Sequence, residues 1–447
     1  MGTGIGHYIP LMTYLGCWVA IVVSLAGRPL WGFYYMIPLL PYRTMRDHFL
    51  EHPLGANVLT ILVLAVIFGA LLHGKRLPKS KLYLIWLAFG IYMYFSMWLG
   101  TALGNEPAPL WIHDANFATW KDYMLLPLVF VAGGLVVEDR KTVRTVILIA
   151  GFALLFIDRS ALRDSMSRSW DTFDESKRDG GPLGFAGSNG LAAFLAQFSM
   201  FFWGFGQFLK RRKAKLLCYA LVGTTIFATM YTFSRASYIA IVAGALLLGI
   251  FKDRKMLIVV AIFLFTWQAI VPTAVTERVM MTKNENGQLE ASAQERVDLW
   301  EAAKKKFYSE PVLGIGYAAF QFGQHTDDLK DTHNWFVKVL VETGLLGGLF
   351  AFALLQQMLT TAYRLFRRAK DPLYQGLGFG LFLTICCSII LNLFGDRWTY
   401  LEINGLLWAL MGTAVAIPRF VEPESASAGA IAPSDSATAV NPYLAYR

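Results

Sequence analysis

A succession of long apolar runs, joined by loops of which every second one is rich in lysine and arginine, constrains this sequence more than any other feature. A helix needs about 20 apolar residues to cross the hydrocarbon core of a bilayer, and most of the runs approach that length. With 55% hydrophobic and only 16% charged residues, the chain does not have the composition of a soluble globular protein. We therefore expect an all-α, polytopic membrane protein with 12 or 13 transmembrane helices, where segment 30–42 is either a short span or a re-entrant piece. The predicted spans are residues 8–27, 30–42, 57–74, 82–100, 123–137, 142–157, 189–209, 216–233, 237–251, 256–272, 334–363, 373–393 and 399–417.

The basic loops orient these helices in the membrane. Lysine and arginine gather at residues 75–81, 140–144, 210–215, 252–255 and 364–370. Because cytoplasmic loops carry the excess of these residues, we place this set in the cytoplasm and the alternate loops on the outer face. Arg43 and Arg46 fall in an outer loop and depart from the rule.

Four parts follow from this topology. Residues 1–272 form the first part of the transmembrane bundle, 273–333 an outer loop, 334–420 the C-terminal transmembrane helices, and 421–447 a cytoplasmic tail. The tail is rich in Ala, Ser and Pro, and we expect it to be disordered.

The outer loop has a helical pattern of its own. Its sequence SAQE at 292–295 is a capping box. Val297, Trp300 and Phe307 then recur at helical spacing with charges between them, and Pro311 follows. This predicts an amphipathic helix that lies over the outer face of the bundle and ends before Pro311.

Charge and cysteine usage exclude several classes of function. Most of the positive residues behind the net charge of +9 lie in short loops, where membrane topology puts them, so nucleic acid is not indicated. The outer acids show no spacing typical of metal ligands, and GIGY at 314–317 lacks the rest of a nucleotide loop, so it predicts a tight turn. We expect no metal and no cofactor. The four cysteines lie in apolar runs as small buried residues: Cys17, Cys218, Cys386 and Cys387.

Cations gather at the outer ends of the predicted spans. An arginine at a helix end often extends to the interface without a further role. Arg235 differs, because its turn between two spans has almost no loop and lies on the face that disfavours cations. Arginine grips phosphate through two parallel hydrogen bonds, so an anionic partner is indicated. The outer cations are Lys121, Arg178, Arg235, Arg296 and Arg397.

The segment DTHNWFVKVLVETGLLGGLF, at 331–350, combines a histidine with charges inside an apolar run. His333 is suited to act as a general base for a hydroxyl. The alternative is an interfacial histidine that caps the helix together with Asn334. Intramembrane charges usually face the protein interior and pair, so Lys338 is the expected partner of Glu342, four residues along the helix.

Three motifs resemble the O-antigen ligase/polymerase superfamily. They are TFSRAS with Ser234 and Arg235, ASAQERVDLW with Arg296 and Trp300, and HNWFVKVLVETGLLGG from His333. The resemblance covers most of the chain from about residue 57 to 415, and the early GRPLWGFYYMIPLLPYR and WKDY look like a branch of O-glycosylation ligases associated with exosortases. GSNG stands where Asn-Asn or Pro-Asn would be expected, which bears on the role of Asn189.

The resemblance implies a metal-independent, inverting transferase of the membrane-embedded GT-C kind. It would move a glycan in one piece from undecaprenyl diphosphate to an acceptor hydroxyl on a glycan, a lipid A-core or a protein. It would do so in a bacterial inner (cytoplasmic) membrane, with the site facing the periplasm. His333 would activate the acceptor, and Arg235 and Arg296 would bind the diphosphate. The residues expected to support the site or bind substrate are Asn334, Glu342, Lys121, Arg178, Arg397, Asn189, Ser234 and Trp300.

Two other readings stay open. A protein O-oligosaccharyltransferase of the same superfamily differs from a ligase or polymerase only in its acceptor. A flippase for the lipid-linked glycan would place polar residues near the membrane midplane and often consist of two related halves. Here the ionic residues cluster at the outer ends of the spans and no internal repeat is visible.

Overall fold

The structure is a computed structural model that describes residues 5–103, 114–175, 178, 180–281, 291–322 and 330–421. Within these ranges the chain is helical, and no strand occurs in them. The predicted all-α class is therefore confirmed. The tail predicted to be disordered lies, apart from residue 421, outside the described residues.

Each predicted span coincides with a helix, because the apolar runs were long enough to be read directly. Further helices lie in the connections: α3 (Arg43–Asp47), α12 (Thr273–Met280), α13 (Ala291–Ser309) and α14 (Ala319–Phe322). The helices that match the predicted spans are α1 (Ile9–Leu25), α2 (Pro29–Met36), α4 (Val58–Leu72), α5 (Lys81–Leu103), α6 (Ala115–Val136), α7 (Arg140–Met166), α8 (Gly187–Gly206), α9 (Arg212–Met230), α10 (Arg235–Phe251), α11 (Lys255–Ile270), α15 (Trp335–Arg368), α16 (Pro372–Asn392) and α17 (Leu401–Ala416).

Seven of the described helices are long and apolar enough to cross a membrane by themselves, or up to eight if the pair α11 and α12, bent by 107°, counts as one span. The protein is thus a polytopic membrane protein. By length and composition fewer helices qualify than the 12 or 13 predicted, because the others are shorter or less apolar than a full span.

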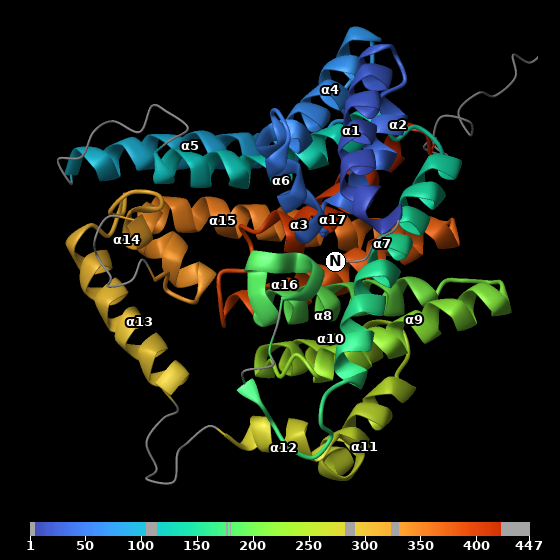
Figure 1. Ribbon diagram of the computed structural model, residues 1–447, viewed down its shortest axis with the longest axis vertical. Helices are drawn as coiled ribbons and strands as arrows, with labels where there is room; N and C mark the ends of the chain where they lie inside the picture. Colours follow the sequence, from blue (N-terminus) through green and yellow to red (C-terminus); the bar gives the residue numbers. More distant parts are fainter. Residues whose placement is uncertain are drawn as a thin grey trace, which may run out of the picture.

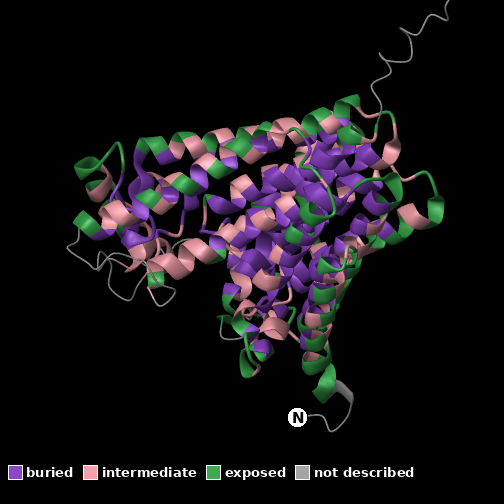
Figure 2. Ribbon diagram, turned by 90° about the horizontal axis from the view of Figure 1, so that it is seen from above, coloured by how far each residue is buried: buried purple, intermediate pink, exposed green. Residues whose placement is uncertain are grey.

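Helices α8, α16 and α17 form the centre of the bundle (Figure 1). The apolar window of α17 is 94% buried inside the protein and that of α16 is 67% buried, whereas only 39% of the window of α5 is buried. The buried residues accordingly concentrate along the middle of the molecule (Figure 2). A helix that is apolar all round and buried by protein forms the frame on which the peripheral helices pack.

The basic loops lie at one end of the bundle, and the alternate loops lie at the other. At the basic end, Arg140, the first residue of α7, pairs with Asp371 before α16, and Lys75 pairs with Glu138. Arg419 donates to the carbonyls of Gly134 and Val137 at the end of α6. These contacts join loops that the sequence assigned to one face.

The two arginines that depart from the positive-inside rule have acidic partners. The Nε atom of Arg43 lies 2.7 Å from Asp47, and Arg46 lies 3.4 Å from Glu402 on the first turn of α17. The Arg46–Glu402 pair is largely buried and ties α3 to α17, whereas the Arg43–Asp47 pair lies within α3 and is partly exposed.

Helix α13 is the amphipathic helix expected in the outer loop. It packs on α15 through a small separate hydrophobic cluster, to which it contributes Leu299 and Ala303, with Phe307 at the edge. The helix ends at Ser309, before Pro311. The side chain of Ser292 is outside the described part, so the capping box stays a prediction.

Helix α15 is broken at Gly344, which has φ 64° and ψ −169°, and is not the continuous span that the sequence predicted. A break at membrane depth is tolerated only where the freed backbone groups are paired within the protein. Segment 311–317 supplies that pairing from both sides of the break. The hydrogen bonds are Ile315 N–H to Val341 O (3.0 Å), Gly316 N–H to Glu342 O (2.8 Å), Leu345 N–H to Pro311 O (2.9 Å) and Leu346 N–H to Val312 O (3.2 Å).

Glycine is required where these segments meet. A Cβ atom on Gly344 would lie 2.2 Å from the carbonyl oxygen of Val312, and one on Gly314 would lie 2.4 Å from the carbonyl carbon of Glu342. Both glycines have positive φ, which other residues adopt only with strain. The turn predicted at 314–317 is therefore present, and its role is to fill the break in α15.

Candidate active site

His333 lies at the entrance of α15, in the last loop before the helix. Asn334 occupies the N-cap position, and its Oδ1 accepts hydrogen bonds from the backbone N–H groups of Phe336 (3.0 Å) and Val337 (3.2 Å). His333 itself has φ 48°, a conformation that is uncommon outside glycine. Its side chain is 40% exposed. The helix cap is therefore Asn334, and the imidazole of His333 is left available.

Asp331 holds the imidazole ring in place. Its Oδ1 accepts from Nδ1 of His333 at 3.0 Å and from the backbone N–H of His333 at 2.8 Å. When Nδ1 donates a proton, Nε2 of the neutral ring is the acceptor. Burial would raise the pKa of Asp331, but the hydrogen bond from His333 and the positive charges of Lys338 and His333 hold it well below its ordinary value. Sequence reasoning missed this role, although Asp331 lies two residues from the histidine.

Helix α13 is tied to the same loop at two points. The indole Nε1 of Trp300 donates to the carbonyl of Thr332 at 2.8 Å, and Nζ of Lys330 lies 2.6 Å from Glu295. The hydrogen bond from Lys330 lowers the pKa of Glu295, and the charges of His333 and Arg296 lower it further. The structure thus brings Trp300 to the loop of His333.

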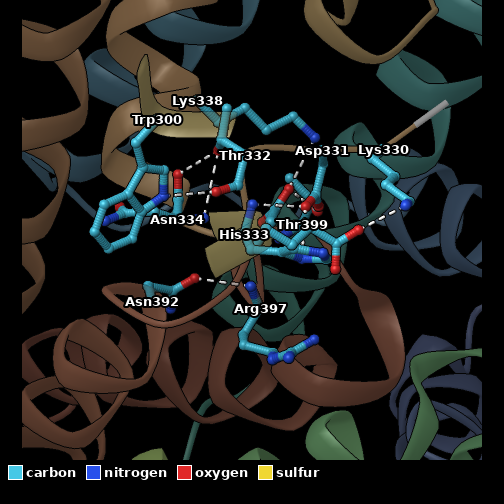
Figure 3. A network of polar contacts seen from close by, with 12 residues as sticks. Trp300, Lys330, Asp331, Thr332, His333, Asn334, Lys338, Asn392, Arg397 and Thr399 are labelled. Atoms are coloured by element: carbon cyan, nitrogen blue, oxygen red, sulfur yellow. Dashed lines mark hydrogen bonds and ion pairs between the residues drawn. The ribbon is translucent and has the colours of Figure 1, made fainter. Parts of the chain in front are cut away.

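The turn between α16 and α17 forms the other side of the site (Figure 3). Asn392 accepts the backbone N–H of Arg397 through Oδ1 at 2.9 Å. Burial lowers the pKa of Arg397, while the charges of Tyr400, Asp331 and Asp396 oppose that shift. Arg397 is therefore within electrostatic reach of the carboxylate that orients His333.

The expected pairing of Lys338 with Glu342 is corrected by the structure. Nζ of Lys338 lies 2.9 Å from Oδ2 of Asp396, which also accepts from the hydroxyl of Thr399 at 3.0 Å. The carboxylate of Glu342 instead accepts from the backbone at Ala318, just before α14. Spacing along one helix could not show this, because Asp396 is 58 residues from Lys338.

We call the set Asp331, His333, Lys338, Asp396 and Arg397 the histidine cluster. A second group, the arginine cluster, consists of Arg178, Asn189, Arg235 and Arg278.

Arg178 and Asn189, predicted separately, meet in the arginine cluster. Nη2 of Arg178 donates to Oδ1 of Asn189 at 2.8 Å, and its Nε donates to the carbonyl of Thr232 at 3.2 Å. Glu175 lies 3.6 Å away and is largely exposed. Burial and the nearby positive charge of Arg278 lower the pKa of Arg178. Asn189 therefore has a defined position in spite of the unusual GSNG sequence.

Arg235 is the first residue of α10, and its Nη1 donates to the carbonyl of Met281 at 2.8 Å. Ser234 before it is buried and caps no backbone group of the helix with its side chain. Arg278 on α12 is buried, and its guanidinium lies 4.9 Å from the ring centre of Phe173. Sequence reasoning missed Arg278. The signal that could have found it is a cation in the short amphipathic segment directly after the apolar run of α11.

Both clusters lie at the same end of the bundle. Gly190, the residue after Asn189, lies close to the first turn of α17. A Cβ atom added to it would be only 3.4 Å from Ile403 in that turn. The turn that carries Arg397 leads directly into that helix. Lys121 is different, since its described contacts are with Asn57 (3.4 Å) and Asp122 (3.3 Å) and with neither cluster.

In the part of the chain that the structure describes, no group of three or more His, Cys, Asp or Glu residues is arranged to hold a metal ion. The arrangement offers a proton acceptor on one side and guanidinium groups on the other. That combination suits the joining of a hydroxyl to a carbon that carries an anionic leaving group.

Residues 220–353 match the family model described as O-antigen ligase. The match includes Arg235, Arg296 and His333, and thus residues of both clusters and of helix α13. No curated protein matches the chain.

Proposed function

We propose a reaction for this chain, which its match over residues 220–353 places in the O-antigen ligase superfamily. As a member it is a membrane protein of the glycan ligase and polymerase kind. In our proposal it transfers a glycan in one piece from undecaprenyl diphosphate to an acceptor hydroxyl, at the periplasmic face of a bacterial inner membrane. The acceptor is another glycan, a lipid A-core or a protein.

The observation that carries the proposal is the hydrogen bond between Nδ1 of His333 and Asp331. It leaves Nε2 as the acceptor of the ring, and the side chain is exposed enough to meet a hydroxyl. A positioned general base of this kind contributes about 10²–10⁴-fold to a rate. The alternative reading, in which the histidine only caps α15, is disfavoured because Asn334 already accepts both N–H groups.

The leaving group calls for positive charge. Arg235 stands at the N-terminus of α10, where the helix dipole adds to its own charge. Arg296 lies on α13, Arg178 lies near Arg278, and Arg397 lies near Asp331 in the turn before α17. Guanidinium groups that face a diphosphate stabilise the charge that grows on its bridging oxygen in the transition state.

In the proposed step, the acceptor oxygen attacks the anomeric carbon from the side opposite to the diphosphate. Its proton passes to Nε2 of His333, and the bond from the anomeric carbon to the diphosphate oxygen breaks. The anomeric configuration is therefore inverted, and undecaprenyl diphosphate leaves. Neither the base nor the arginines require a metal ion for this step.

The test is a reconstitution of the purified protein in lipid vesicles with a defined undecaprenyl-diphosphate glycan and EDTA. Lipid A-core, a second lipid-linked glycan and a candidate protein are offered separately as acceptors. We expect one of them to gain the intact glycan with inverted configuration at the new linkage, as read by NMR of the product. Passage of the lipid-linked glycan across the bilayer without any new linkage would contradict the proposal and favour a transporter.

A further inference from the structure

Lys338 is a buried cation whose position the proposed reaction does not yet explain. It lies in the first part of α15 and is only 6% exposed. Its ion pair with Asp396 joins the entrance of α15 to the turn between α16 and α17. Charges buried in membrane proteins are costly and usually serve a function.

The charge of Lys338 acts on both sides of the site. Besides Asp396 it faces Glu342, Asp331 and Tyr317. Asp331 in turn faces His333 and Lys338, and its charge also acts on Arg397 and Tyr400. The side chain of Lys338 reaches over the loop toward Asp331 and Thr399 (Figure 3). Lys338 therefore stands between the carboxylate that orients the base and the carboxylate beside Arg397.

Lys338 itself has no access to a sugar. It borders a cavity of about 10 Å³, lined also by Tyr317, Glu342 and Thr399. That volume holds no more than about one water molecule. Any effect of Lys338 on glycan transfer must act through the residues it contacts.

We propose that Lys338 is a positioning residue, which holds Asp331 behind His333 by its charge and holds the turn of Arg397 through its ion pair with Asp396. His333 and Arg397 thereby stay in a fixed position relative to each other. This inference rests on the proposed function, because it assigns the roles of base and of phosphate ligand to the residues that Lys338 positions.

A double-mutant cycle tests the inference with Lys338→Met, Asp396→Asn and the double variant. Each single change leaves one buried charge unpaired, so stability and transfer both fall. The double variant removes both charges and regains thermal stability, but its kcat stays about tenfold below that of the wild type, with a smaller change in KM for the donor. Recovery of kcat together with stability would show that the pair is structural only and would overturn the inference.

The matched control is Arg140→Gln, which breaks the Arg140–Asp371 ion pair at the opposite end of the bundle. We expect this variant to keep its kcat. A loss equal to that of Lys338→Met would mean that any broken ion pair lowers transfer, which also overturns the inference.

A second measurement does not depend on transfer. In protein labelled with ¹⁵N-histidine, His333 is assigned by comparison with His333→Ala, and its signals report which ring nitrogen carries the proton. We expect proton at Nδ1 in the wild type and a mixture of tautomers in Lys338→Met. An unchanged His333 signal in Lys338→Met contradicts the positioning role. If the tautomer responds but the wild type transfers no glycan to any acceptor, the positioning stands and the proposed reaction falls.

Discussion

The histidine cluster and the arginine cluster lie at one end of the bundle but are held together by different partners. In the histidine cluster, ionic side chains pair with one another, as in His333 with Asp331 and Lys338 with Asp396. In the arginine cluster, Arg178 and Arg235 donate to the uncharged oxygens of Asn189 and Met281, and the acid beside Arg178, Glu175, is largely exposed. In our proposal the first arrangement fixes the proton acceptor, and the second brings guanidinium groups together for an anion.

The comparison predicts that changes in the two clusters affect different kinetic constants. Changes in the histidine cluster should lower kcat, because they act on the chemical step. Changes in the arginine cluster should also raise KM for the lipid-linked donor, because they act on a group that is bound before the reaction.

The largest effect is expected for His333→Ala. Loss of the base should lower kcat by about 10³-fold, with little change in the affinity for the donor. The measurement is the initial rate of transfer at several donor concentrations, with thermal unfolding to verify the fold. A variant that transfers glycan at close to the normal rate would remove His333 from the reaction.

Asp331→Asn should lower kcat by about a hundredfold, because an amide can hold the wrong tautomer of the imidazole.

The same variant also tests how the ionisation of Asp331 is linked to the stability of the protein. The pKa of Asp331 lies below its ordinary value in the folded protein, so its contribution to stability is fully present above about pH 3.9 and is lost as the pH falls through the lower, folded value.

The difference in unfolding free energy between the wild type and Asp331→Asn should therefore narrow as the pH falls below about pH 4. Thermal unfolding at a series of pH values on both sides of about pH 4 measures it. A difference that grows toward low pH would contradict an ionised Asp331.

Arg235→Lys should lower kcat/KM by about 10–100-fold, mainly through KM, because lysine keeps the charge but cannot bind phosphate with two parallel hydrogen bonds. The readout is the dependence of rate on donor concentration. Full activity of the lysine form would mean that charge alone is sufficient, and the contrast between the clusters would then rest on charge and not on geometry.

The smallest effect is expected for Asn189→Ala, which removes one hydrogen bond to Arg178. We expect a rise of about fivefold in KM for the donor and an unchanged kcat. A loss confined to kcat would place Asn189 with the histidine cluster and break the comparison.

The sequence was sufficient for the helices, because apolar runs are local features, whereas the roles of the site residues, chosen from charges near the ends of those runs, stay predictions. Arg178 and Asn189, and likewise Trp300 and His333, were selected separately, and the structure brings the members of each pair together. Two features were not predictable in this way. The partner of Lys338 is distant in sequence, and the break at Gly344 lies inside a run whose composition fits an unbroken helix. Both depend on tertiary contacts, with Asp396 and with segment 311–317.

The break in α15 also changes what counts as a unit of this molecule. Residues 335–343 share a hydrophobic cluster with α13 and α14 and accept backbone hydrogen bonds from segment 311–317. The first part of α15 is therefore held by the outer loop as well as by the bundle core, and the break at Gly344 separates it from the rest of the helix. A chimera that exchanges the outer loop with that of a relative should place its downstream junction at Gly344, since a junction at the start of the apolar run would separate the base from the scaffold that carries it.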